Sequence, residues 1–62
     1  MTEVVYELLS GGARRCVRVT LDIDTLERAY RGYIDRGDGV VHLQPQWCDH
    51  LREAVAWCME AP

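Results

Sequence analysis

The chain has 62 residues, and a domain of this size buries only about 60% of the surface that its unfolded chain exposes, so residues 1–62 form a single small domain at most. A hydrophobic fraction of 48% predicts a globular fold, whereas a formal net charge of −3 disfavours a primary role in gripping nucleic acid or an anionic membrane. Every cation is arginine, a habit of GC-rich coding that indicates a bacterial or bacteriophage source.

The sequence also indicates in which cellular compartment the protein is expected. No basic N-terminal stretch leads into an apolar segment, and no apolar run is long enough to cross a bilayer. Cys16, Cys48 and Cys58 form an odd set without a secretory context, which indicates reduced thiols. We therefore expect a cytoplasmic protein without a membrane partner.

Two alternating runs predict a β-hairpin. Residues 3–9 and 14–21 each place apolar side chains at every second position. The Gly-Gly pair between them suits the positive φ angles of a two-residue turn. The register that brings both apolar faces to one side makes two cross-strand pairs, Tyr6 with Val17 and Val4 with Val19.

The next segment changes period. Between residues 23 and 36 the apolar residues recur every three or four positions, as on one face of a helix. Asp22 or Asp24 can cap the start of this helix, and Gly37 can end it in the left-handed conformation. The apolar stripe consists of Ile23, Leu26, Tyr30, Tyr33 and Ile34.

A short strand and a second helix complete the expected fold. Asp38 and Gly39 form a turn, residues 40–43 form one strand, and Pro45 suits the first turn of a helix that runs to Met59. The predicted class is α+β in the order ββαβα: a β-hairpin plus a short third strand in a small antiparallel sheet, packed by two amphipathic helices. The expected core is Val4, Tyr6, Val17, Val19, Leu21, Leu26, Tyr30, Leu51 and Val55.

The second predicted helix carries more apolar surface than one sheet can cover. Its apolar arc covers roughly half of the circumference, wider than the stripe of about 100° that one-sided packing needs. We expect this surplus surface to bind protein, and the simplest partner is a second copy of the chain, which gives a homodimer. The predicted protein-binding residues are Trp47, Trp57, Met59 and His50.

We predict no catalytic residue, no metal site and no cofactor. On one helix Cys48 and His50 would point about 200° apart, and Cys48 and Cys58 would lie roughly 15 Å apart along the axis, so the three cannot share an ion. His42 and His50 have no predictable cysteine partner for nucleophilic chemistry. The expected protein is therefore not an enzyme.

One segment resembles a known family. Residues 16–34, a strand Cys-Val-Arg-Val-Thr-Leu followed by a capped turn and an amphipathic segment, look like the opening of ribbon-helix-helix DNA-binding proteins. In that family the outward strand residues enter the major groove. The resemblance implies that Arg14, Cys16, Arg18 and Thr20 face DNA, which makes a DNA-binding transcriptional regulator the alternative function.

The favoured function is a small protein-binding module, such as an inhibitor or adaptor of bacterial or phage origin that acts through protein-protein contacts. An acidic chain with surplus apolar and aromatic surface offers Trp, Tyr and Arg, which supply much of the energy of protein interfaces. The sequence does not identify the partner. Because of the net charge, we expect a protein rather than a nucleic acid.

Overall fold

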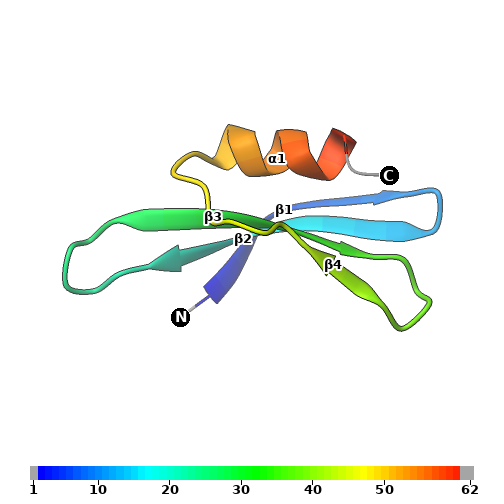
Figure 1. Ribbon diagram of the computed structural model, residues 1–62, viewed down its shortest axis with the longest axis horizontal. Helices are drawn as coiled ribbons and strands as arrows, with labels where there is room; N and C mark the ends of the chain where they lie inside the picture. Colours follow the sequence, from blue (N-terminus) through cyan, green and yellow to red (C-terminus); the bar gives the residue numbers. More distant parts are fainter. Residues whose placement is uncertain (1, 61–62) are drawn as a thin grey trace.

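The structure is a computed structural model that describes residues 2–60. Its elements are β1 (Thr2–Ser10), β2 (Ala13–Leu21), β3 (Arg28–Asp35), β4 (Val41–Leu43) and α1 (Leu51–Glu60). The strands form one antiparallel sheet in the order β1-β2-β3-β4. The helix lies along one face of this sheet (Figure 1).

This order of elements corrects the predicted fold. The described chain is ββββα with one helix, whereas the sequence predicted two helices in the order ββαβα. The segment predicted as the first helix contains β3, which pairs with β2 along its whole length. Tyr30, Tyr33 and Ile34 favour strands, and Gly32 costs about 1 kcal/mol relative to alanine inside a helix. Without β3, the second edge of β2 would leave its backbone N–H and C=O groups unpaired, which also favours a neighbouring strand.

The same order of elements excludes a ribbon-helix-helix arrangement of residues 16–34. In that family a helix follows the DNA-reading strand directly, but here the strand that contains Arg18 is followed by β3. The strand is also an inner one, because β1 and β3 pair with its two edges. It is therefore not half of a free two-stranded ribbon.

The second predicted helix begins later than expected. It starts at Leu51 rather than near Pro45, because the intervening segment runs beside β3. The N–H of Cys48 donates to the carbonyl of Tyr30 at 2.7 Å, and the N–H of Tyr30 donates to the carbonyl of Cys48 at 2.8 Å. Trp47 consequently precedes the helix instead of lying on it.

Two turns of the sheet contain glycines in the left-handed conformation. Gly11 and Gly12 have φ angles of 59° and 79°, as the predicted two-residue hairpin turn requires. Gly37 and Gly39 have φ angles of 79° and 84° between β3 and β4. Gly37 therefore adopts the left-handed conformation in a strand turn and not at the end of a helix. The short strand predicted at residues 40–43 is confirmed as β4.

The predicted hairpin is confirmed, but part of its register is wrong. Tyr6 pairs with Val17 as expected. A bulge between Val4 and Tyr6 then shifts the pairing, so Val4 lies opposite Arg18 instead of Val19. The shift turns Val4 away from the core face, and its side chain is 44% exposed.

The core lies between α1 and the sheet. Val17, Ala54 and Cys58 are fully buried there. Gly32 allows the close approach, because a Cβ atom at this position would lie 2.4 Å from Cε3 of Trp57. The partly buried side chains on this side of the sheet include Tyr6, Val19, Tyr30, Leu51 and Val55.

Three predicted core residues are exposed instead. Val4 and Leu21 are 44% and 43% exposed, and Leu26 is 74% exposed. Leu26 lies in the loop of residues 22–27 because the helix that would have buried it does not form. Ile34, which the helical stripe included but the predicted core did not, is fully buried.

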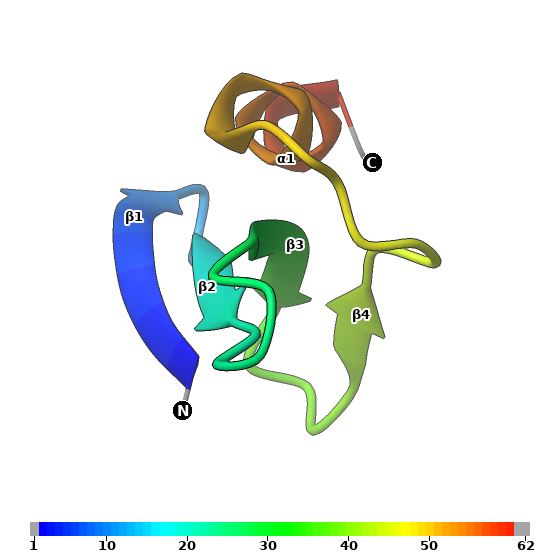
Figure 2. The same ribbon diagram turned by 90° about the vertical axis from the view of Figure 1, so that its left-hand side faces the viewer.

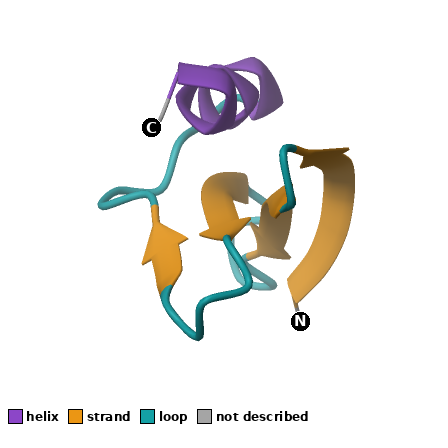
Figure 3. Ribbon diagram, turned by 90° about the vertical axis from the view of Figure 1, so that its right-hand side faces the viewer, coloured by secondary structure: helices purple, strands orange, loops and turns teal. Residues whose placement is uncertain are grey.

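The face of the sheet opposite α1 carries no helix within residues 2–60, and we call it the open face. Figure 2 shows α1 on one side of the four strands, and Figure 3 shows the same from the other end. The two faces of the sheet therefore meet different surroundings, one a helix and the other solvent.

Candidate binding site on the open face

Alternation along β2 and β3 decides which side chains reach the open face. Gly32 and Val17 face α1, so their neighbours point the other way. In β3 these neighbours are Arg31 and Tyr33. In β2 the neighbours are Cys16, which is buried, and Arg18, which pairs with Arg31 in the register.

Arg18 is stacked on Tyr33. The guanidinium carbon lies 4.5 Å from the centroid of the tyrosine ring. A cation above an aromatic face at this distance is attracted by the ring quadrupole. The contact also restrains a long side chain, so the positive charge is presented from a defined position.

Arg31 is held by the segment that follows β4. Its Nε–H donates to the backbone carbonyl of Gln44 at 2.7 Å, and its guanidinium carbon lies 5.6 Å from the ring centroid of Trp47. The side chain of Gln44 accepts from the N–H of Gly32 at 2.9 Å and donates to Sγ of Cys48 at 2.9 Å. These bonds fix Trp47 beside the sheet.

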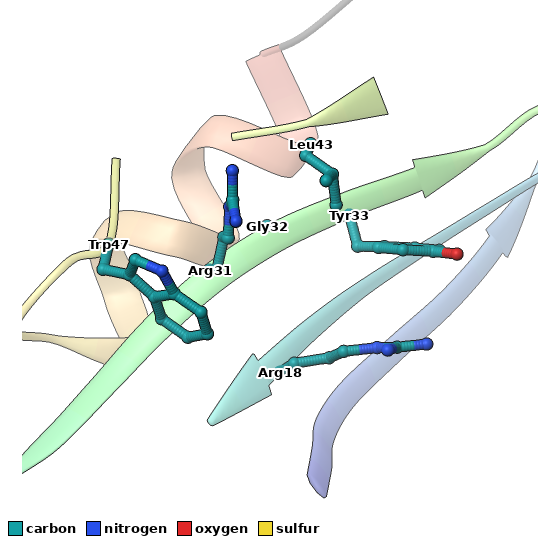
Figure 4. Close-up of a pocket in the computed structure, with 6 residues that line it drawn as sticks. All are labelled: Arg18, Arg31, Gly32, Tyr33, Leu43 and Trp47. Atoms are coloured by element: carbon teal, nitrogen blue, oxygen red, sulfur yellow. The ribbon is translucent and has the colours of Figure 1, made fainter. Parts of the chain in front are cut away.

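The side chains surround a depression of about 260 Å³. Figure 4 shows the stack of Arg18 on Tyr33 and the indole of Trp47 beside Arg31. Leu43 and Trp47 are 46% and 45% exposed, so accessible apolar surface borders the depression. We call Arg18, Arg31, Tyr33, Leu43 and Trp47 the arginine-aromatic patch.

Charge is distributed unevenly along the open face. Toward the hairpin turn, Nη2 of Arg14 donates to Oε2 of Glu7 at 3.0 Å, and this bond is the main reason that the pKa of Arg14 is raised. Asp35, the register partner of Arg14, adds a second carboxylate there. The described residues that line the depression include Arg18 and Arg31 and no carboxylate. The positive charge of this face is therefore concentrated in the patch.

The four residues predicted to bind protein lie on different surfaces. Trp47 is in the patch on the open face. Trp57 is half-buried and packs over Gly32 on the opposite side of the sheet. Met59 is 57% exposed on α1, and His50 is exposed immediately before the helix. The structure thus brings Trp47 together with arginines and not with the other three.

The residues that the family resemblance assigned to DNA alternate along β2, but Cys16 is only 1% exposed, so its side chain is not available to DNA. Arg14, Arg18 and Thr20 alternate along β2 and lie on the open face. Sequence reasoning missed Arg31 and Tyr33, because it assigned both to a helix. The glycine between them was the available signal, because glycine disfavours a helix interior and marks a place where another group approaches the backbone closely.

The three cysteines are free thiols. Cys58 is buried, and this burial raises the pKa of its thiol. Its Sγ lies 3.4 Å from the carbonyl oxygen of Cys16. A protonated, buried thiol is a poor nucleophile. Within residues 2–60, His, Cys, Asp and Glu side chains form no group of three that could hold a metal ion.

Comparison with known proteins found no matching family model, no similar curated protein and no similar solved structure. In the part of the chain that the structure describes, no helix has the length and apolar character needed to cross a membrane.

Proposed function

We propose that this protein is a small, non-enzymatic binding module that takes a protein partner through the arginine-aromatic patch. The observation that carries the proposal is the gathering of two guanidinium groups and two aromatic rings around one depression. Neither the strands nor α1 cover this depression. Four of the five patch residues, all except Trp47, lie on strands of the sheet, and a rigid element positions binding groups more accurately than a loop does.

The composition of the patch supports a protein partner. Trp, Tyr and Arg are the residues most enriched at the energetic centres of protein interfaces, and the patch contains all three. Leu43 and its neighbour Val41, 46% and 40% exposed, extend the apolar surface along β4. The net charge of −3 weakens the case for a partner recognised through a phosphate backbone.

The patch also defines the chemistry of the partner segment. The depression accepts an apolar side chain, and the two guanidinium groups at its border accept carboxylates, to which arginine can form paired hydrogen bonds. Arg18 and Arg31 are already restrained by Tyr33 and Gln44. Binding therefore orders fewer side chains and loses less conformational entropy. We propose a partner segment that is both apolar and acidic.

We propose that the module acts as an inhibitor or adaptor of bacterial or phage origin in the cytoplasm. The free thiols of Cys16, Cys48 and Cys58 fit a reducing compartment. The exclusive use of arginine as the cation fits a GC-rich genome. The patch supplies positive charge and exposed apolar surface around a depression, and both can contact a protein partner.

Differential capture tests the proposal. Immobilised wild type is compared with Trp47→Ala, with Arg31→Ala and with the control Arg52→Ala, which changes an exposed cation on α1. We expect one protein to be retained by wild type and control and lost by both patch variants. With the purified partner, each patch variant should raise Kd about tenfold or more by calorimetry, as for a residue at the centre of an interface. Equal affinity of the patch variants for this partner would contradict the proposal.

A second candidate ligand is a single-stranded nucleic acid. Arg14, Arg18 and Thr20 lie in a row on the open face, and the stack of Arg18 on Tyr33 provides a flat platform. Proteins that bind single strands combine cations with aromatic rings on which bases stack. A single strand fits better than duplex DNA, because the major groove admits a helix or a two-stranded ribbon and not the face of a four-stranded sheet.

Fluorescence titration separates the two candidates. Labelled oligo-dT and a labelled duplex are titrated with protein at low and moderate salt. If single strands bind, two or three neutralised phosphates predict that log K falls with log salt with a slope of about −1.4 to −2.1. No anisotropy change at micromolar protein would remove this candidate and leave the protein partner.

A further inference from the structure

The loop that joins β2 to β3 is an ordered protrusion. The N–H of Leu26 donates to the carbonyl of Asp22 at 2.7 Å, and the N–H of Asp22 donates to the carbonyl of Glu27 at 2.9 Å. Oδ1 of Asp22 also accepts from the N–H of Asp24 at 2.9 Å. The aspartate that the sequence suggested as a helix cap therefore caps this loop. Residues 22–27 keep a defined shape without packing on the core.

This loop displays two large aliphatic side chains to solvent. Ile23 is 82% exposed and Leu26 is 74% exposed. Leu26 has a φ angle of +60°, a conformation that disfavours residues with a Cβ atom. A glycine would suit this position better, so the leucine is not explained by the backbone. The folded monomer gains little from either side chain, and their placement points to an intermolecular contact.

Charge specifies what the loop can contact. Asp22, Asp24 and Glu27 surround the two aliphatic residues, so the tip is apolar with an acidic border. Such a tip complements an apolar hollow with a basic border. The chain itself carries one, because the depression of the arginine-aromatic patch is apolar at Leu43 and Trp47 and basic at Arg18 and Arg31.

The volumes are compatible. The depression measures about 260 Å³. A benzene-sized guest occupies an apolar cavity of about 150 Å³, so the side chain of Leu26 or Ile23 can enter the depression. An inserted leucine would bring the neighbouring carboxylates of the loop toward two guanidinium groups. Charge-assisted hydrogen bonds to arginine are among the stronger ones in proteins.

We propose that the loop of residues 22–27 of one copy docks into the arginine-aromatic patch of a second copy. The inference rests on the proposed function of the patch, and it identifies a second copy of this chain as one protein that the patch binds. It also gives the expected homodimer a location on the open face, in place of the predicted surface on the second helix.

The positions of loop and patch favour a closed pair. A second depression beside the base of the loop, lined in part by Thr20, Asp22 and Glu27, also reaches Trp47. The loop and the patch therefore adjoin on one molecule. When donor and acceptor surfaces are neighbours, one two-fold axis can satisfy both contacts and no open fibre results.

Complementary variants test the docking. The tip variant carries Leu26→Gly with Ile23→Ser; glycine suits the positive φ angle, so this change removes the leucine without straining the fold. The patch variant carries Trp47→Ala. Sedimentation at protein concentrations up to several hundred micromolar should show a wild-type dimer, and each variant should raise the dimer Kd about tenfold or more.

Mixing the two variants is the decisive step. The tip variant keeps an intact patch and the patch variant keeps an intact tip, so the mixture can form one contact that neither variant forms alone. The fluorescence of Trp47 in the tip variant should change when the patch variant is added. A protein that carries both sets of changes is the matched control and should leave the signal unchanged.

The outcomes separate this inference from the proposed function. A monomeric wild type at these concentrations, or a dimer that survives both sets of changes, would overturn the docking of loop into patch. Capture of a different protein through the patch would still stand in that case. A dimer that weakens in both variants and re-forms on mixing supports the inference whether or not another partner is found.

Discussion

The two faces of the sheet are made from alternate residues of the same strands, yet they are built in opposite ways. At the centre of the face under α1 the sheet presents the compact groups Gly32 and Val17, and the helix packs Ala54 and Cys58 against them, with Tyr6 and Tyr30 of the sheet at the border of this cluster. On the open face the same strands present arginine and tyrosine. On the covered face α1 approaches the sheet closely at Gly32, whereas on the open face the long side chains of Arg18 and Tyr33 contact each other.

The comparison shows how so short a chain can hold both a core and a binding surface. Close approach at Gly32 lets one helix of modest length bury the centre of the sheet. The stability of the fold is thereby concentrated on one face, and the patch can vary without removing core contacts. If this division is correct, substitutions on the two faces should have clearly different effects on folding.

The largest effect is expected at Ile34. Its side chain is fully buried, so Ile34→Ala removes apolar contacts and leaves a cavity, which should lower the free energy of unfolding by about 2–5 kcal/mol. Leu43→Ala is the matched control, because it also truncates an aliphatic side chain but at a site that is 46% exposed. Urea unfolding followed by circular dichroism measures both. Equal losses would show that the two faces contribute alike.

Gly32→Ala tests the close approach directly. The new Cβ atom would lie 2.4 Å from Cε3 of Trp57 and 3.0 Å from Sγ of Cys58, so α1 must move away from β3. Overpacking of this kind should lower the free energy of unfolding by about 1–3 kcal/mol.

A double-mutant cycle shows whether the indole causes this loss. Combining Gly32→Ala with Trp57→Leu should cost less than the sum of the single changes, because the smaller side chain leaves room for the methyl group. Strictly additive losses would mean that the glycine is required for another reason, such as backbone geometry.

The buried thiol of Cys58 gives the covered face a pH dependence. Burial raises the pKa of this thiol above its ordinary value, so the folded state keeps its proton at a pH where the unfolded chain has lost it. The associated stability is complete below the unfolded pKa of about 8.5, and it declines as the pH rises from there through the higher folded value. In denaturant titrations, Cys58→Ala should show a weaker decline above this pH than wild type does. Identical profiles would contradict burial as the cause.

The sequence predicted the hairpin and the short strand because each depends on local chemistry. The turn residues Gly11 and Gly12 and the alternation around them require no knowledge of the rest of the chain. The strand β3 was missed for a geometric reason. Tyr30 and Ile34 are four residues apart, a spacing that puts two residues on one face of either a helix or a strand.

Only Tyr33 and Gly32 distinguish the two interpretations. In a helix Tyr33 would join the apolar stripe, but in β3 it lies on the open face, where it stacks with Arg18. The contact across strands cannot be read from one segment. The same holds for Trp47, whose position depends on hydrogen bonds between Cys48 and Tyr30.

The candidate site was therefore only partly predictable. Arg18 and Trp47 were both identified from the sequence, but as members of different surfaces. Their union in one patch depends on the register of β2 with β3 and on the extended segment after β4. Long-range pairing of this kind decides which side chains meet, and the order of residues along the chain does not reveal it.

The smallest effect on folding is expected at Trp47, although its side chain is among the largest in the protein. It is 45% exposed and lies outside the core, so Trp47→Ala should change the free energy of unfolding by about 1 kcal/mol or less. Its emission should be lost as well, which leaves the half-buried Trp57 as the sole indole and shifts the spectrum to shorter wavelength. Urea unfolding and the fluorescence spectrum of the same sample measure the two effects together. A loss of stability as large as that of Ile34→Ala would mean that the open face supports the fold, and the patch would then have to be explained by packing rather than by binding.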